Sequence, residues 1–349
     1  MIIGLGFASG KYFLPASSDT QPYALDYRRI AINIPITHSH FLADKTYALG
    51  EKYLAESLSK AFQKEGYVAA VYTLQDTYAE RYPSSGYEFY MRAYPELEPE
   101  FYHRVFDDDR ISVLFETIPY QLSEVQNADI VFTGSLKRYH YYRELGVNAY
   151  FMPQFTSFDD FYPALDETKQ TDVLYIANQW PKHPIRKTIQ YALEAGVKLD
   201  VYGENWEKIL VGEAAKYWKA PQVPNDQLKY YYSSAKIVLN DMRDDMIEAG
   251  FISNRVFDVT ACQGFLISQY SAEIEEIYGD AIPMYRSAEE FKSLIDYYLR
   301  HPEERKTKAF QAYQITKQRF GREQIVRDML RYMEDFRRKK ALGVQKDAQ

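Results

Sequence analysis

A basic residue and an acidic residue stand close together at the predicted start of one helix. Arg255 follows Asn254, where the helix is expected to begin, and Asp258 lies one turn later. Helix N-termini present free N–H groups and the positive end of the helix dipole, so they bind anions. The Arg255 side chain could thus receive an anionic group. The alternatives are a surface ion pair of Arg255 with Asp244 or Asp245, and a helix-terminal charge at Asp258 that the dipole stabilises.

A second cluster of cations follows the strand predicted over residues 172–177. Lys182, Arg186 and Lys187 lie in the loop that leaves this strand and at the start of the next helix. In a parallel sheet such a loop lies at the carboxyl edge of the strands, where ligands bind. The three cations therefore predict a second contact to phosphate, with an ordinary solvated loop as the alternative.

The region around the helix that is expected to begin at Asn254 has the pattern of a strand, a loop, a helix and a second strand. The strands are expected over 236–240 and 265–269, and a polar loop is expected over 241–253. So short a succession indicates a parallel βαβ crossover, whose ligand crevice lies outside the carboxyl ends of its strands. These ends are residues 240–245 and 269–272.

The same region resembles a known family. The pattern consists of Asn254-Arg255-x-Phe257-Asp258-x-x-Ala261-Cys262-x-Gly264, then Ala288-Glu289-Glu290-Phe291, and then Leu299-x-His301-Pro302-Glu303-Glu304-Arg305. It is similar to the C-terminal half of bacterial CgeB-like glycosyltransferases, and the similarity covers roughly residues 170 to 330. The resemblance implies the GT-B fold, in which two Rossmann-like α/β domains with parallel sheets face each other across a cleft.

The resemblance also implies a reaction. A sugar would move from a nucleotide-diphosphate donor, with a UDP-sugar expected, to a glycan or another hydroxyl acceptor. Cationic side chains would stabilise the departing diphosphate, so no obligatory metal or other cofactor is expected. The donor-binding candidates are Lys182, Arg186, Asn254, Arg255 and Asp258.

One position departs from the pattern of the related families. They usually place a Glu at the position of Asp258, where it accepts hydrogen bonds from the ribose, and often another Glu eight residues earlier. This chain has Gly250 at the earlier position. Glu248 or Asp245 could substitute for the missing carboxylate.

An inverting transfer needs a base for the acceptor hydroxyl, whereas a retaining transfer needs none. The loop after the first predicted strand offers His38, His40 and Asp44, and Glu116 ends the strand predicted over 111–115. Positioned His and carboxylate side chains can accept such a proton. The alternatives for His38 and His40 are a plain loop and a metal pair, but no third ligand stands nearby and no metal site is expected.

Strands alternate with helical patterns in both halves of the chain, which predicts two α/β domains. In the first half, strands are expected over 30–35, 67–72, 111–115 and 129–133, and helices over 47–64 and 139–145. The expected division is an N-terminal extension over 1–28, an acceptor domain over 29–154, a linker over 155–171, a donor domain over 172–318, and a C-terminal helix over 319–349 that crosses back to the first domain.

The composition of the chain limits the number of domains, the binding partners and the cellular location to be expected. A chain of 349 residues with 46% hydrophobic content can fill two cores, and a net charge of -7 disfavours general binding to nucleic acid. The single cysteine, Cys262, excludes an intrachain disulfide and agrees with a reducing compartment, so a cytoplasmic location is expected. No stretch approaches the ~20 apolar residues of a membrane helix, which leaves only peripheral membrane contact open.

The sequence leaves two other functions open. One is a nucleotide-sugar epimerase of the same architecture. The other is a non-catalytic glycan-binding or scaffold subunit, which Gly250 and the abundance of tyrosine, with 33 copies, suggest. The run Asp107-Asp108-Asp109 imitates the Asp-x-Asp metal motif of another glycosyltransferase fold, but a solvated turn is expected there.

Overall fold

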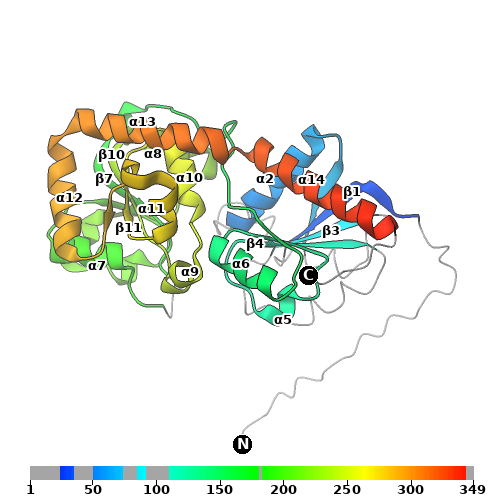
Figure 1. The fold of residues 1–349 in the computed structure, drawn as a ribbon. Helices are drawn as coiled ribbons and strands as arrows, with labels where there is room; N and C mark the ends of the chain where they lie inside the picture. Colours follow the sequence, from blue (N-terminus) through cyan, green and yellow to red (C-terminus); the bar gives the residue numbers. More distant parts are fainter. Residues whose placement is uncertain (1–23, 35–49, 74–84, 92–109, 181–182, 343–349) are drawn as a thin grey trace, which may run out of the picture.

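Two six-stranded sheets form the two halves of the protein, and every strand pair in them is parallel (Figure 1). The computed structural model describes residues 24–34, 50–73, 85–91, 110–180 and 183–342. Helices pack against both sheets, as the figure shows. This arrangement confirms the predicted fold class of two α/β domains with parallel sheets.

The first sheet has the strand order β2-β1-β3-β4-β5-β6. Its strands supply apolar side chains to two clusters, one shared with the apolar face of α2 and another that includes Val125 and Tyr142. The strands are β1 (Asp26–Asn33), β2 (Val68–Tyr72), β3 (Ser85–Met91), β4 (Ile111–Glu116), β5 (Ile130–Thr133) and β6 (Ala149–Phe151). The helices are α2 (Gly50–Lys64), α5 (Leu122–Val125) and α6 (Leu136–Glu144).

The sequence pattern missed β3, which lies between β1 and β4 in the middle of this sheet. Its sequence includes a glycine and a glutamate, so it lacks the continuous apolar run that marks its neighbours. All seven residues are nevertheless buried. The Glu88 carboxylate accepts a hydrogen bond from Asn33 Nδ2 at 2.8 Å and pairs with Arg110 at 3.1 Å, and these partners make its burial tolerable.

The second sheet has the strand order β12-β11-β10-β7-β8-β9. Its strands are β7 (Thr171–Ile176), β8 (Asp200–Tyr202), β9 (Trp218–Ala220), β10 (Ala235–Asn240), β11 (Leu266–Gln269) and β12 (Met284–Tyr285). The helices of this half are α7 (Lys187–Glu194), α8 (Leu228–Ser234), α9 (Asp244–Ala249), α10 (Asn254–Ala261), α11 (Ala272–Tyr278), α12 (Ala288–Arg300) and α13 (Pro302–Arg319). Short 3-10 turns cover Glu167–Lys169, Trp206–Lys208, Gly212–Tyr217, Asn225–Gln227 and Gly279–Ala281.

Two features of this half differ from the expectations. The segment 241–253, expected to be a polar loop, contains α9, which ends at Gly250 in the left-handed region with φ +78°. The strand order also reverses between β7 and β10, because the chain adds β8 and β9 on one side of β7 and then returns to the other side. In parallel sheets this reversal opens a crevice at the carboxyl edge.

The chain crosses between the two halves twice, and the two crossings are bonded to each other. The amide of Thr156 donates to the carbonyl of Phe320 at 3.0 Å, and the amide of Arg322 donates to the carbonyl of Thr156 at 2.9 Å. The last helix, α14 (Arg322–Ala341), then packs Ile325, Val326 and Met329, among others, into the core of the first half. Figure 1 shows α13 and α14 running in succession across both halves.

A second set of contacts joins the halves at α9. Ser135, which caps the N-terminus of α6, donates its hydroxyl to the carbonyl of Ala249 at 2.5 Å. Lys137 donates to the carbonyl of Glu248 at 2.8 Å. Cations near a helix C-terminus are favourable because of the helix dipole. The first half is therefore bonded directly to the segment between β10 and α10.

Gly203 lies directly after β8, where the main chain passes very close to the residue that follows β7. Its φ is +139°, and an added Cβ would lie 2.1 Å from the carbonyl oxygen of Ala177. Gly196 also has a positive φ, of +65°, but nothing lies within 4 Å of its Cβ position. We expect Gly203→Ala to lower the urea midpoint far more than Gly196→Ala, which costs only the left-handed strain of roughly 1–2 kcal/mol. Equal losses for the two variants would contradict the close approach.

Candidate functional site

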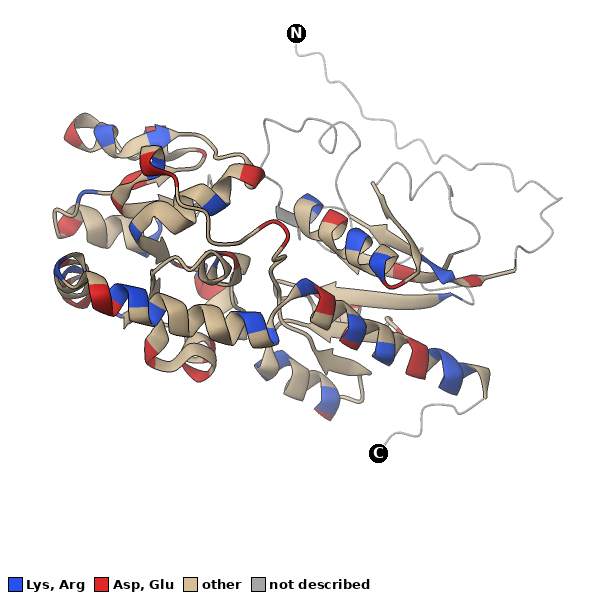
Figure 2. Ribbon diagram, turned by 90° about the horizontal axis from the view of Figure 1, so that it is seen from above, with Lys and Arg blue, Asp and Glu red and all other residues tan. Residues whose placement is uncertain are grey.

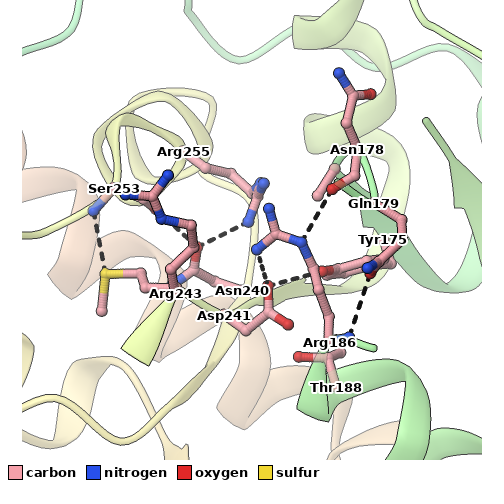
Figure 3. A network of polar contacts seen from close by, with 12 residues as sticks. Tyr175, Asn178, Gln179, Arg186, Thr188, Asn240, Asp241, Arg243, Ser253 and Arg255 are labelled. Carbon is pink, nitrogen blue, oxygen red and sulfur yellow. Dashed lines mark hydrogen bonds and ion pairs between the residues drawn. The ribbon is translucent and has the colours of Figure 1, made fainter. Parts of the chain in front are cut away.

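The crevice between β7 and β10 gathers two arginines and their polar partners (Figure 3). Arg186 is the N-cap residue of α7, and Arg255 lies in the first turn of α10. Their guanidinium groups reach the carboxyl edge of the sheet from different helices, above the consecutive residues Asn240 and Asp241. The structure thus brings together two of the cations that the sequence proposed separately.

A buried carboxylate fixes the orientation of Arg186. Asp241, the first residue after β10, accepts a hydrogen bond from Arg186 Nη1 at 3.1 Å and another from the Tyr175 hydroxyl at 2.7 Å. The Nε of Arg186 donates to the carbonyl of Asn178 at 3.0 Å. Burial raises the pKa of Tyr175 well above its ordinary value of 10.0, so this hydroxyl keeps its proton and donates. Arg186 is therefore held in place before any ligand binds.

Arg255 is anchored by a neutral group instead. Its Nη1 donates to Asn240 Oδ1 at 3.0 Å, and its guanidinium lies 5.8 Å from the centroid of the Tyr175 ring. Within the described part of the chain it forms no ion pair, since Asp244 pairs with Lys187 at 2.9 Å and Asp245 with Arg243 at 2.6 Å. The proposed surface ion pair of Arg255 is therefore not what the structure shows, and the charge of Arg255 has no direct counter-ion there.

Two residues of this network were not singled out from the sequence. Asp241 falls in the strand end that was predicted to border the crevice, and that position was its only signal. Gln179 is buried and donates from Nε2 to the carbonyls of Trp180, His183 and Pro184, each at 3.1 Å. It thereby holds the loop in front of Arg186, a role without any sequence signature.

The predicted ribose ligand, Asp258, is buried and accepts two hydrogen bonds. Its Oδ1 accepts from the Thr156 hydroxyl at 2.8 Å, and its Oδ2 accepts from Asn254 Nδ2 at 2.7 Å. Burial raises the pKa of Asp258 from an ordinary 3.8 to about 7, despite these two donors. Asp258 therefore connects the start of α10 to the segment that joins the two halves.

A cavity of about 420 Å³ opens beside these residues and is shared by both halves of the protein. Its walls come from α2, the residues after β4, the segment 154–161 that joins the two halves, the end of β7, α8 and the start of α10. The lining residues are Tyr53, Leu54, Ser57, Thr117, Ile118, Gln154, Phe155, Ser157, Asp160, Phe161, Ile176, Asn225, Tyr232, Ser253, Asn254, Arg255 and Asp258. Three of the predicted donor-binding residues, Asn254, Arg255 and Asp258, therefore face one space.

Glu116 does not have the position expected of a base. It is fully buried, and its Oε1 accepts from Arg138 at 2.8 Å, from the Tyr142 hydroxyl at 2.7 Å and from the amide of Tyr120 at 2.9 Å. Burial raises the pKa of Glu116, with the Arg138 charge opposing the shift. Its neighbours Thr117 and Ile118 line the cavity, but Glu116 does not. The geometry gives Glu116 a structural role in the first half in place of the expected catalytic one.

The other expected residues fall into two groups. His38, His40, Asp44 and Lys182 lie outside the described residues. At Gly250, φ is +78°, and an added Cβ would lie 2.8 Å from Glu273 Oε1 and 3.0 Å from Ser135 Oγ, so a larger side chain would be strained and would displace its neighbours. The suggested substitutes, Glu248 and Asp245, are exposed, and neither lines the 420 Å³ cavity.

The two facing parallel-sheet domains, with a cavity shared between them, define the GT-B class of fold. Residues 179–331 match the protein family described as glycosyl transferase-like. The Spore protein CgeB of Bacillus subtilis (strain 168) is 27% identical over 213 residues, which cover 56% of this chain and 65% of that protein. The resemblance to CgeB-like proteins is therefore confirmed.

Solved structures support the same fold. Sucrose-phosphate synthase from Thermosynechococcus elongatus superposes with a TM-score of 0.67 at 12% identity, covering 88% of this chain and 98% of that one. Anabaena HepE, solved in complex with UDP and glucose, superposes with a TM-score of 0.60 at 10% identity, covering 88% and 99%. These likenesses confirm the GT-B fold.

The described part of the chain offers no candidate for a membrane-spanning helix or a metal site. None of the described helices combines the length and apolar character needed to cross a bilayer. No three His, Cys, Asp or Glu side chains of the described residues gather into a metal-binding set.

The raised pKa of Asp258 predicts a pH dependence of stability. Because folding makes this carboxyl hold its proton more tightly, its contribution is fully present below about pH 4 and is lost as the pH rises to about 7. Asp258→Asn cannot ionise. We therefore expect the melting temperature of the variant, relative to the unmodified protein, to rise between pH 5 and pH 8. The exposed control Asp226→Asn should show no such trend, and a constant difference for Asp258→Asn would contradict the shift.

Proposed function

We propose that this protein is a glycosyltransferase that moves a sugar from a nucleotide-diphosphate donor to a hydroxyl of a glycan or another acceptor. The observation that carries the proposal is the convergence of Arg186 and Arg255 at the crevice of the second sheet. A diphosphate bears several negative charges, and among the described carboxylates none neutralises Arg255 directly. The family match over 179–331 supports the same reaction class.

The two arginines have different parts in the proposed site. Arg186 is already paired with Asp241, so it supplies directed N–H donors more than net charge. Arg255 is held by the neutral Asn240 and supplies the uncompensated charge. A charge fixed before the reaction stabilises the developing negative charge on the leaving diphosphate without further reorganisation. Lys182, which stands four positions before Arg186 in the sequence, is proposed as a further phosphate contact.

The nucleoside would occupy the cavity beside α10. Asp258 and Asn254 line it and are proposed to receive the ribose hydroxyls, while Phe155, Phe161 and Ile176 provide apolar surface. Each Asp258 oxygen accepts one hydrogen bond and keeps a lone pair for another. A UDP-sugar is the donor proposed, because HepE, which shares the fold, was solved with UDP and glucose.

The proposed reaction balances as a substitution at the anomeric carbon. The bond from that carbon to the diphosphate oxygen breaks, the acceptor oxygen bonds to the carbon, and the hydroxyl proton leaves. In an inverting transfer a base takes that proton, and His38, His40 and Asp44 are the proposed candidates. In a retaining transfer the departing diphosphate can take it, and no base from the protein is needed.

The acceptor is proposed to be a sugar or a small hydroxyl compound in preference to nucleic acid. The chain carries a net charge of -7. Figure 2 shows basic and acidic residues interspersed along α13 and α14, and pairs such as Arg331 with Asp328 and Arg337 with Glu334 neutralise each other there. Phosphodiester backbones favour an uncompensated basic surface.

Replacing Arg255 tests the diphosphate contact. Arg255→Ala removes a charge-assisted hydrogen bond worth roughly 1.5–3 kcal/mol, so UDP affinity measured by calorimetry should fall about 10-fold or more. Arg243→Ala is the matched control, because Arg243 is a nearby arginine already paired with Asp245 at 2.6 Å. We expect its effect to stay within about 2-fold, as for most surface ion pairs. A folded Arg255→Ala protein with unchanged affinity would remove the basis of the proposal.

Chelation tests the proposed independence of metal ions. Arginines at helix starts supply the stabilisation that Asp-x-Asp sites obtain from a divalent ion, so transfer should persist in excess EDTA. The assay should follow donor hydrolysis, transfer to acceptor and sugar interconversion separately. Interconversion without an acceptor would indicate an epimerase instead, and no turnover of bound donor would indicate a scaffold. Activity that is lost in EDTA and restored by manganese would contradict metal independence. It would direct attention to Asp107 and Asp109, which lie outside the described residues.

A further inference from the structure

Two residues that line the 420 Å³ cavity each carry a polar side-chain atom without a hydrogen-bond partner among the described residues. These atoms are the Oδ1 of Asn254 and the Oγ of Ser157, and both atoms are buried. Ser157 as a whole is only 5% exposed. A buried polar group without a partner costs about 1–3 kcal/mol, so such groups are uncommon unless a ligand satisfies them.

Asp258 fixes the orientation of the Asn254 amide and anchors the residue before Ser157. The Nδ2 of Asn254 donates to Asp258 Oδ2 at 2.7 Å, and a carboxylate can only accept there, so the amide must turn its Oδ1 the other way. The other carboxylate oxygen accepts from the hydroxyl of Thr156, the residue before Ser157. The main chain of Thr156 is in turn bonded to Phe320 and Arg322. The two atoms without partners therefore lie on a rigid wall.

The chemistry of the two atoms defines the ligand group that they can bind. An amide oxygen only accepts hydrogen bonds, and a serine hydroxyl both donates and accepts. A ligand that satisfies both must present at least one O–H or N–H donor and a second group able to bond to a hydroxyl. Neighbouring hydroxyls on a sugar ring meet this requirement. A phosphate does not, because its oxygens would face the Asn254 oxygen without a donor.

We propose that Ser157 and Asn254 recognise the ribose hydroxyls of the donor and so select ribonucleotides over deoxyribonucleotides. The inference rests on the proposed function, because it assigns the cavity to the nucleoside of a nucleotide sugar. It goes further in adding Ser157, a residue of the segment between the two halves, and in making Ser157 and Asn254 the contacts that select the ribose. Asp258 acts on selection through these two residues, as a positioning residue, besides any direct contact that it makes.

Ser157→Ala is the decisive variant, because a structural role and a binding role predict opposite results. If Ser157 Oγ lacks a partner in the free protein, its removal leaves the melting temperature unchanged or raises it. If it binds a ribose hydroxyl, its removal weakens UDP by about 3- to 10-fold, the equivalent of roughly one neutral hydrogen bond. The same change should shrink the preference for UDP over either 2'-deoxy-UDP or 3'-deoxy-UDP by a similar factor.

Ser57→Ala is the matched control. Ser57 lines the same cavity, but its hydroxyl already accepts a hydrogen bond from Arg322 Nη1 at 3.2 Å. Removal of this hydroxyl should leave the ratio of UDP to deoxy-UDP affinities unchanged. Asn254→Ala, tested in the same way, should reduce the ratio independently of Ser157.

The experiment is calorimetry of the full chain with UDP and its two deoxy forms, preceded by a screen of ADP, CDP, GDP and UDP. If another of these four nucleotides binds more tightly than UDP, that nucleotide and its two deoxy forms are used instead. No binding of any of them at millimolar concentration would overturn the proposed function and this inference together. Binding with a ratio that Ser157→Ala and Asn254→Ala leave unchanged would overturn this inference alone.

Discussion

Thr156 is the residue on which the arrangement of the two halves and the site depends most. Its main chain bonds to Phe320 and Arg322, and its side chain donates to Asp258. One buried residue thus joins the outgoing chain, the returning chain and the helix that carries Arg255. Arg322 reinforces the junction, since it is buried and pairs with Asp159 and Glu323, each at 2.7 Å. A shift of either crossing would therefore disturb the wall of the cavity.

Arginines compensate several buried carboxylates of the described residues, whereas Arg255 lies at the crevice without a counter-ion among those residues. Glu88, Glu116 and Asp241 are buried carboxylates, and each is paired with an arginine. Such pairs are required because an isolated charge in the interior loses most of its hydration energy. Arg255 is the exception among the arginines of the crevice, since a neutral amide anchors it. This imbalance is the basis of the proposed diphosphate contact at the crevice.

The contacts between α6 and α9 connect the first half of the protein to the segment that borders the crevice in the second half. Ser135 and Lys137 bond to the last carbonyls of α9, and α9 lies between β10 and the start of α10. The left-handed Gly250 then turns the chain toward Ser253 and Asn254. A side chain at position 250 would collide with groups from both halves. The glycine that departs from the family pattern therefore fits both the left-handed backbone and the short distance to its neighbours.

The sequence determined the elements and the kinds of residue at their ends. The alternation of apolar runs and helical patterns predicted nearly all of the strands and helices around the crevice, because periodicity is a local property of the chain. It also placed Arg186 and Arg255 at helix starts after strands, where the parallel topology brings them to one edge. The missed strand β3 shows the limit of this reasoning. Its Glu88 is acceptable in a buried strand only because Asn33 and Arg110 meet it in space.

The tertiary structure alone decided which groups meet. Asp241 binds Arg186 from 55 positions away, and Thr156 binds Asp258 from 102 positions away. No local pattern encodes such pairs, since they arise from how the sheets and crossings are packed. The same packing enclosed Glu116 with Arg138 and left Ser157 and Asn254 with atoms that have no partner among the described residues. The residue types at the site could therefore be read from the sequence, whereas their burial, charge balance and hydrogen-bonding capacity depend on contacts that only the folded chain makes.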